Sequence, residues 1–238
     1  QAFSRRPGFV VGWMIIFSGV IGAATVALGF AGYFQSLVGT PLVPSALVLL
    51  IALCAIALAG VKQSAQVAVI LTIIEASGLI FVILLGIPHL GSVNYLEMPF
   101  GVSGIFQASA LIFFAFIGFE EMVKLSEEAK DPEKNIPRAL IMAISVSIVL
   151  YIMVALCAVS VLGWQKLSQS SAPFAEIAYA ALGQSASIAI SVMALFATTN
   201  TVLLMLLASS RIIYGMAESS SLPRMLSQVH PKTGTPWA

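Results

Sequence analysis

The sequence predicts an all-α membrane protein with six transmembrane helices, and three observations support this fold class. Hydrophobic residues make up 59% of the 238 residues, and charged residues only 9%. Mean hydropathy is +1.02, far above that of a water-soluble domain. Six apolar runs each approach the roughly 20 residues that a helix needs to cross a bilayer. They cover about residues 8–34, 43–61, 65–88, 102–119, 139–163 and 185–210.

The connections between these runs are too short to hold a water-soluble domain, so residues 1–238 are expected to form a single, partial transmembrane domain. The chain begins at Gln1 and ends in a predicted loop at Ala238, which suggests a piece of a larger membrane protein. Cys54 and Cys157 both lie within apolar runs, where neither a disulfide nor a metal pair is expected. A lipid bilayer is the expected surrounding, and no nucleic-acid partner is expected.

The positions of the basic residues predict the orientation in the membrane, because short cytoplasmic loops are enriched in Lys and Arg. If six helices alternate, ten of the 11 basic residues fall on one side, and Lys166 alone falls on the other. Both ends of the chain are therefore expected in the cytoplasm, in a multi-pass protein of the cell membrane. The ten are Arg5, Arg6, Lys62, Lys124, Lys130, Lys134, Arg138, Arg211, Arg224 and Lys232.

The fourth run ends in an unusual way, because Gly118 and the acidic pair Glu120 and Glu121 follow directly on an aromatic stretch. A glycine beside polar side chains is where a membrane helix can break and present backbone carbonyls to a substrate. The alternative is that Gly118 only allows a neighbouring helix to pack closely, with two ordinary interfacial carboxylates after it.

Glu75 lies near the middle of the third run, among apolar residues. An ionised carboxylate is costly at that depth, so this side chain is expected to face the protein interior. It can act there as a proton carrier or as a partner for a cation. A purely structural hydrogen bond to a neighbouring helix is the alternative.

The sixth run contains a polar cluster at mid-helix depth, formed by Thr198, Thr199, Asn200 and Thr201. Such side chains can line a cavity, or they can hydrogen-bond one helix to another. In the first run, a small residue recurs at every fourth position, which favours close packing of helices. This stripe consists of Gly19, Ala23, Ala27 and Ala31.

Local signals predict further helix boundaries outside the six runs. Residues 173–182 are expected to form a short helix that Pro173 opens and Gly183 ends. Asp131 and Pro132 are expected to stop one helix, and Asn135 to cap the next, with Pro137 in its first turn.

Two stretches resemble the amino-acid permeases of the amino acid–polyamine–organocation superfamily. FFAFIGFE at 113–120, followed by SEEAKDPEKNIPRA at 126–139, resembles the family's sixth helix and the loop after it. ASSRIIYGMAE at 208–218, continuing through Leu222-Pro223 and the 229–236 loop, resembles the end of the eighth helix. One departure is Ser219-Ser220-Ser221, where the family usually has Asp-Gly before Leu-Pro.

This resemblance implies that the six runs are the family's third to eighth helices, within a fold of two inverted five-helix repeats. The substrate in this family lies between the broken first and sixth helices. The chain would then lack the first two helices and everything after the eighth, and with them half of the substrate site. The orientation predicted from the basic residues agrees with this register.

The resemblance also implies roles for individual residues. The carbonyls of Phe114 and Ile117 would bind the substrate's amino group, while Phe114 and Phe116 would wall its side-chain pocket. Gly118 would permit the unwinding, and Glu120 matches an acidic residue that some relatives use for proton dependence. The substrate-binding residues implied in this way are Phe114, Ala115, Phe116, Ile117, Gly118, Thr198, Thr199 and Asn200.

Glu75 and Glu120 are the implied proton-coupling residues, although several relatives have a lysine near the position of Glu75. Secondary active transport of an amino acid or a related amine is therefore expected, by proton coupling or by exchange. A helical channel or sensor subunit with a polar intramembrane site is the alternative. No catalytic, cofactor or metal site is expected, since His89 and His230 lie in predicted loops and no ligand-like cluster is present.

The predicted orientation can be tested with single cysteines in a background that lacks Cys54 and Cys157. Glu128→Cys and Lys232→Cys are expected to face the cytoplasm, and Ser170→Cys to face outward. In sealed cells, an impermeant thiol reagent should therefore label position 170 alone. Labelling at position 128 with none at position 170 would contradict the orientation.

Overall fold

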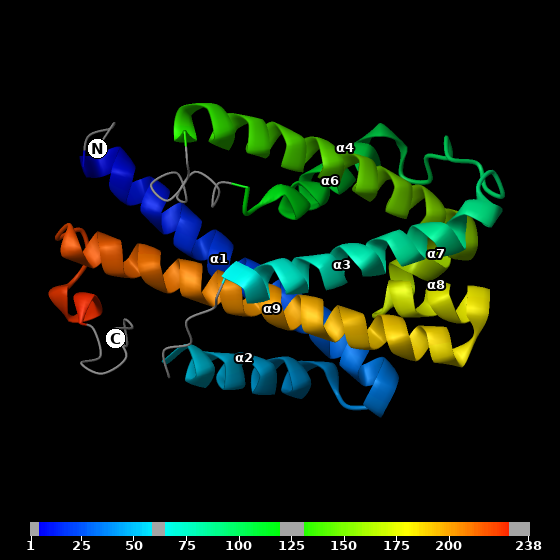
Figure 1. The fold of residues 1–238 in the computed structure, drawn as a ribbon, viewed down its shortest axis with the longest axis horizontal. Helices are drawn as coiled ribbons and strands as arrows, with labels where there is room; N and C mark the ends of the chain where they lie inside the picture. The colour runs from blue at the N-terminus through cyan, green and yellow to red at the C-terminus, as the bar shows by residue number, and fades with distance from the viewer. Residues whose placement is uncertain (1–4, 59–64, 120–130, 229–238) are drawn as a thin grey trace. The chain divides into compact units, whose positions relative to one another are not determined.

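The computed structural model describes residues 5–58, 65–119 and 131–228, and within these ranges the regular elements are helices. Contacts divide the chain into two compact units, one of residues 1–78 and 170–238 and the other of residues 79–169. Figure 1 shows the helices of both units. The helices of the first unit are α1 (Arg5–Val38), α2 (Leu42–Leu58), α8 (Pro173–Leu182), α9 (Gln184–Glu218) and the short η4 (Arg224–Ser227). The second unit holds η1 (Ile87–His89), α4 (Gly101–Ile112), η2 (Phe113–Phe116), α6 (Pro132–Leu162) and α7 (Trp164–Gln169), and the division falls within α3 (Ala65–Gly86).

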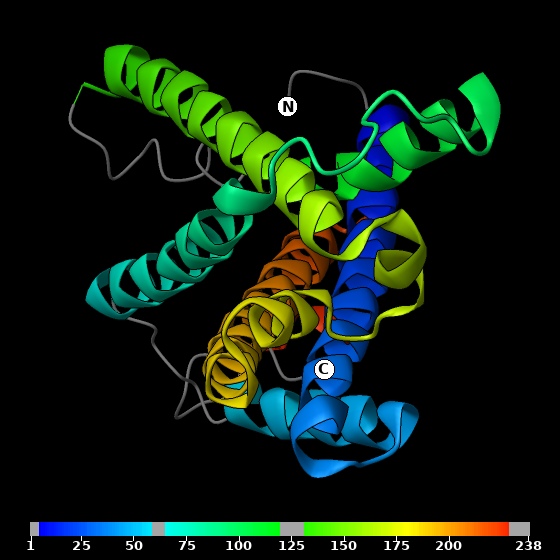
Figure 2. The ribbon, with the colours of Figure 1, turned by 90° about the vertical axis from the view of Figure 1, so that its right-hand side faces the viewer.

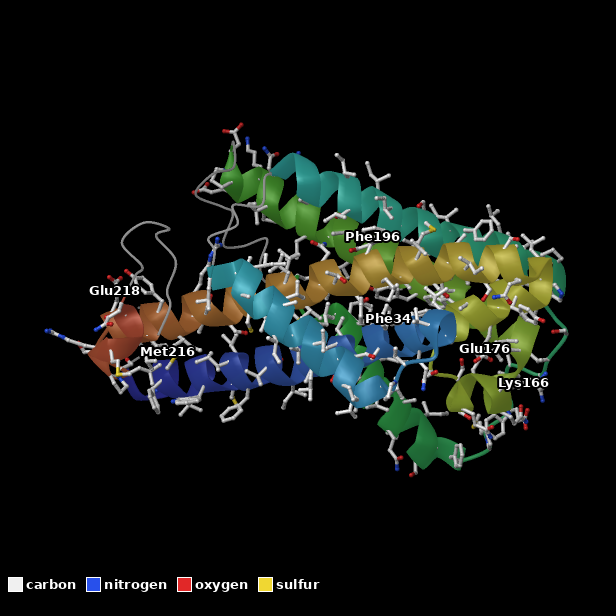
Figure 3. All side chains as sticks on the ribbon, turned by 90° about the horizontal axis from the view of Figure 1, so that it is seen from below. Phe34, Lys166, Glu176, Phe196, Met216 and Glu218 are labelled. Carbon is white, nitrogen blue, oxygen red and sulfur yellow. The ribbon has the colours of Figure 1, made fainter. Side chains whose placement is uncertain are left out.

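In the first unit, α1 and α9 pack against each other in opposite directions. Near the start of α1, Gly12 lies against Met216 of α9, whose side chain is seen beside α1 in Figure 3. Near the end of α1, Ser36 lies 3.5 Å from Ser191 of α9, hydroxyl to hydroxyl. The start of α1 and the end of α9 therefore share one end of this unit, as two helices with the predicted alternation require.

The stripe of small residues in α1 forms the tightest part of this packing, as the sequence predicts. Ala27 and Ala31 are fully buried, together with Val202 of α9. A Cβ added to Gly19 would overlap the hydroxyl of Ser209. Small side chains thus let the two backbones approach closely. In a lipid bilayer, van der Waals packing of this kind is a main source of helix association.

The predicted short helix is confirmed with its boundaries, as α8. It begins at Pro173 and is ended by Gly183, whose φ of +82° suits a glycine. Its buried side consists of Ala175, Ile177 and Ala178, and Figure 2 shows it folded beside the start of α9.

In the second unit, the loop after η1 is fixed to α6 by a chain of hydrogen bonds. The hydroxyl of Ser160 donates to the carbonyl of Leu156 (2.6 Å), so Tyr95 donates to Ser160 Oγ (2.6 Å) and accepts from the Gly91 N–H (2.7 Å). Ser92 Oγ donates in turn to the Ser160 carbonyl (2.7 Å). Of these residues Ser160 is buried, and its hydroxyl has the partners that a buried polar group requires.

The predicted cap at Asn135 is wrong, because α6 begins at Pro132 and Asp131 is its N-cap residue. The Asp131 carbonyl accepts the N–H of Lys134 (3.1 Å) and of Asn135 (3.0 Å), so the helix is already formed where the sequence suggested a cap. A proline is well suited to the first position of a helix, and Pro137 is then accommodated inside α6 at the cost of one backbone bond.

Four helices among the described residues are long and apolar enough to cross a membrane: Pro7–Val38, Ile70–His89, Pro132–Leu162 and Gln184–Glu218. Leu42–Leu58 and Gly101–Phe116 are apolar but shorter. The expected spans 43–61 and 102–119 therefore correspond to shorter helices. Several residues named above lie outside the described ranges: Lys62, Glu120, Glu121, Lys124, Glu128, Lys130, His230 and Lys232.

Close packing at Gly86 leads to a prediction about stability. A Cβ added there would lie 2.8 Å from Cys157 Cα, a backbone atom that cannot move aside cheaply. Gly86→Ala should therefore destabilise the full-length protein by about 1–3 kcal/mol, seen as a lower midpoint of thermal unfolding in detergent.

Gly29→Ala is the matched control, because an added Cβ in this part of α1 meets no atom of the described residues within 4 Å. It should leave the midpoint unchanged or raise it slightly, since alanine is the better helix former. Equal midpoints for both variants would contradict the packing of Gly86 on Cys157.

Candidate functional site

The predicted break in the fourth apolar run is present in the second unit. The α-helix ends at Ile112, and Phe113–Phe116 continue it as a tighter 3₁₀ turn. Ile117 is then extended (φ −72°, ψ 134°), and Gly118 has a φ of +113°, which an L-residue rarely adopts. The chain direction therefore changes at Ile117–Gly118.

The break alters the hydrogen bonding of the backbone around it. The Ile117 N–H donates to the Phe114 carbonyl (3.2 Å), in the i to i+3 pattern of a 3₁₀ turn. The Ala115 carbonyl accepts instead from a side chain, the hydroxyl of Tyr151 in α6 (3.2 Å). The ring of Tyr151 also meets Phe116 edge to face, with 5.6 Å between the centroids and 78° between the planes.

The predicted site residues on this segment differ in exposure. Phe114 and Phe116 are half-buried, whereas Ala115, Ile117 and Gly118 are exposed. Phe116 also stacks on Phe119, at 6.1 Å between ring centroids. Glu120, the expected proton-coupling residue on this segment, lies outside the described residues.

The first unit contains the other group of predicted site residues, on α9 and α3. Asn200 is buried, and its Nδ2 donates a hydrogen bond of 3.4 Å to Oε1 of Glu75, which is half-buried. A hydrogen bond thus joins Glu75 and Asn200, two polar side chains that the sequence predicts at mid-membrane depth.

The hydroxyl of Thr198 bonds within its own helix, to the carbonyl of Ala194 (2.7 Å). Thr201 does the same with the carbonyl of Ala197 (3.0 Å). Such bonds satisfy a hydroxyl in an apolar surrounding without a partner helix. Thr199 is half-buried in the same stretch. Within the cluster, Asn200 is therefore the residue with a described bond to another helix.

The two groups belong to different units: Phe114–Gly118 to residues 79–169, and Glu75 with Thr198–Asn200 to the other unit.

Tyr151 was not predicted from the sequence. The signal that could have identified it is a tyrosine in the middle of an otherwise apolar run. Among the described residues, no group of three or more His, Cys, Asp or Glu side chains could hold a metal ion.

Comparison with known proteins gives a family for the whole chain. The family model described as amino acid permease matches residues 1–238. The methylthioribose transporter of Bacillus subtilis is 32% identical over 96% of this chain and 54% of its own length. The branched-chain amino acid permease BcaP of the same organism is 28% identical, also over 96% of this chain and 54% of its own length.

A plant relative, cationic amino acid transporter 1 of Arabidopsis thaliana, is 30% identical over 96% of this chain and 41% of its own length. The chain thus spans about half the length of the curated relatives it matches. Together with its apolar helices, these matches make it part of a multi-pass membrane protein of a transporter family, not of an enzyme family. The chain belongs to the amino acid permease family of the amino acid–polyamine–organocation superfamily.

Proposed function

We propose that this chain is about half of a secondary transporter that carries an amino acid or a related amine across the cell membrane. The observation that carries the proposal is the break at Ile117–Gly118, where an apolar helix gives way to an extended residue and a glycine of positive φ. Broken helices of this kind form the substrate sites of secondary transporters. Three relatives are named for branched-chain amino acids, cationic amino acids and methylthioribose. The proposal therefore names a class of small solutes as substrate, and no single compound.

The proposed topology has six spans, the third to eighth helices of the inverted-repeat fold. At about 1.5 Å per residue, the 12 residues of α4 extend about 18 Å. The hydrocarbon layer is about 30 Å thick, so a helix of this length that starts at the interface ends inside it. This length supports a break near mid-membrane depth.

The proposed substrate contacts follow from the chemistry of the exposed backbone. An ammonium group has three donors and no acceptor, so carbonyl oxygens suit it. The Phe114 carbonyl accepts from the Ile117 N–H and has a second lone pair to offer, and the Ile117 carbonyl follows it along the extended segment. Phe114 and Phe116 would wall the substrate's side chain, and Thr198–Asn200 of the eighth helix are proposed as substrate contacts in their own unit.

Proton coupling or exchange is the proposed driving mechanism, with Glu120 and Glu75 as the candidate carriers. The Asn200 amide supports such a role for Glu75 in a particular way. Its N–H can donate to a carboxylate oxygen or to the C=O of the protonated acid, so the contact accommodates both charge states. Glu120 follows the break directly in the sequence, where alternating exposure to water would let it exchange a proton.

The break leads to a prediction about transport by the full-length protein. Gly118→Leu should lower the initial rate of amino-acid uptake at least tenfold, with normal insertion into the membrane. The reason is the backbone, since φ of +113° costs a non-glycine residue about 1–3 kcal/mol. An added Cβ meets no atom of the described residues within 4 Å, so steric overlap is not the expected cause.

Gly39→Leu is the matched control for this variant. Gly39 also has a positive φ (+76°) and no atom of the described residues within 4 Å of an added Cβ, but it lies between α1 and α2. It should retain uptake within about twofold of wild type. Wild-type uptake by Gly118→Leu would show that transport does not depend on the positive φ at this position.

The two carboxylates are expected to differ in their effect on the pH dependence of uptake. Glu120→Gln should give a flat profile between about pH 5 and 8, because it removes the exchangeable proton. Glu75→Gln should keep most activity and a normal profile, since the amide oxygen can still accept from Asn200. Initial uptake rates of both variants across this pH range show which carboxylate is responsible for the pH dependence. A flat profile from Glu75→Gln beside a normal one from Glu120→Gln would reverse the assignment.

A further inference from the structure

The contact between Tyr151 and the Ala115 carbonyl replaces a backbone hydrogen bond that the break removes. In a continuous α-helix, the Ala115 carbonyl would accept from the N–H of residue 119. Ile117 is extended and Gly118 has a positive φ, so the chain leaves the helical path before that residue. An unpaired carbonyl is costly in the bilayer core, and the Tyr151 hydroxyl supplies a donor at 3.2 Å.

A second contact holds Tyr151 on the same segment. Its ring meets the ring of Phe116 edge to face, at 5.6 Å and 78°, a favourable geometry for aromatic pairs. Tyr151 therefore touches two successive residues of the break, one through its hydroxyl and one through its ring. It lies well inside α6, which is continuous from Pro132 to Leu162 and gives the side chain a rigid base.

The Tyr151 bond also changes which carbonyls a substrate can use. The Ala115 oxygen accepts the Tyr151 hydroxyl at 3.2 Å, and the Phe114 oxygen accepts the Ile117 N–H at the same distance, which leaves a carbonyl its second lone pair. An arriving ammonium group would have to compete with Tyr151 at Ala115. The described bond of the Tyr151 hydroxyl goes to Ala115, so the carbonyls of Phe114 and Ile117 meet no such competition from it.

We propose that Tyr151 is a positioning residue of the transport site. It keeps Ile117 and Gly118 off the helical path after the 3₁₀ turn and occupies the Ala115 carbonyl, which leaves the carbonyls of Phe114 and Ile117 for the substrate's amino group. The claim that Tyr151 maintains the break rests on the geometry alone. The claim that it directs the substrate's amino group rests on the proposed function. The two claims are therefore tested by separate measurements.

The first measurement is amide hydrogen exchange in the substrate-free, full-length protein, comparing wild type with Tyr151→Phe. The variant keeps the ring on Phe116 and removes only the hydroxyl. The released Ala115 carbonyl should then pair with the N–H of Phe119 as the helix re-forms, and exchange at Phe119 should slow about tenfold. Unchanged or faster exchange would show that Tyr151 does not hold the segment open, whatever the protein transports.

The second measurement is substrate affinity, from binding of the amino acid that the wild-type protein takes up best. Tyr151→Phe should raise Kd about tenfold, and Tyr151→Leu, which also removes the ring, should raise it further. Thermal unfolding without substrate should stay close to that of Tyr179→Phe, a control on the exposed face of α8. A Kd within twofold of wild type for both Tyr151 variants would overturn the positioning role.

Failure of the proposed function would give a different pattern. If the wild-type protein neither binds nor takes up any amino acid, the proposed function is wrong, and the exchange measurement still decides whether Tyr151 maintains the break. If wild type transports normally and Tyr151→Phe changes neither exchange nor Kd, the proposed function stands and the Tyr151 inference falls.

Discussion

Backbone N–H and C=O groups in the core of a bilayer have no water to bind, so each must find a partner within the protein. A continuous helix meets this demand by itself, and an interrupted one does not. The end of α4 at Ile112, the 3₁₀ turn at Phe113–Phe116 and the extended Ile117 therefore create a local shortage of backbone partners. Tyr151 relieves this shortage at the Ala115 carbonyl.

The same constraint explains the polar side chains of the first unit. Thr198 and Thr201 satisfy their hydroxyls on their own helix, which makes them compatible with an apolar surrounding. Asn200 and Glu75 cannot do so as easily and bond to each other. Close packing of α1 on α9, through Ala27 and Ala31, gives this unit a tight helix pair around which the polar contact is arranged. Packing by small residues and hydrogen bonding between polar side chains thus both stabilise helix association in this unit.

Local features of the fold could be predicted from the sequence, because they depend on neighbouring residues. Gly118 after an aromatic run indicated the break, and Pro173 with Gly183 bounded α8. The cap at Asn135 was predicted wrongly, because two prolines close together offer two possible helix starts and the first one, Pro132, is used. Contacts between distant segments were not predictable. Tyr151 and Ala115 are 36 residues apart, and Glu75 and Asn200 are 125 apart, so their meeting depends on how each helix is rotated.

The central claim is that the substrate's amino group binds at the break, and protection from thiol labelling tests it most directly. Ile117→Cys would be placed in the full-length protein, in a background lacking Cys54 and Cys157, with Met98→Cys in an exposed loop as the control. The rate of labelling by a small aqueous thiol reagent would be measured with and without a saturating amino acid. The account predicts several-fold slower labelling at position 117 and no change at position 98. Equal rates at position 117 with and without an amino acid that the protein transports would contradict it.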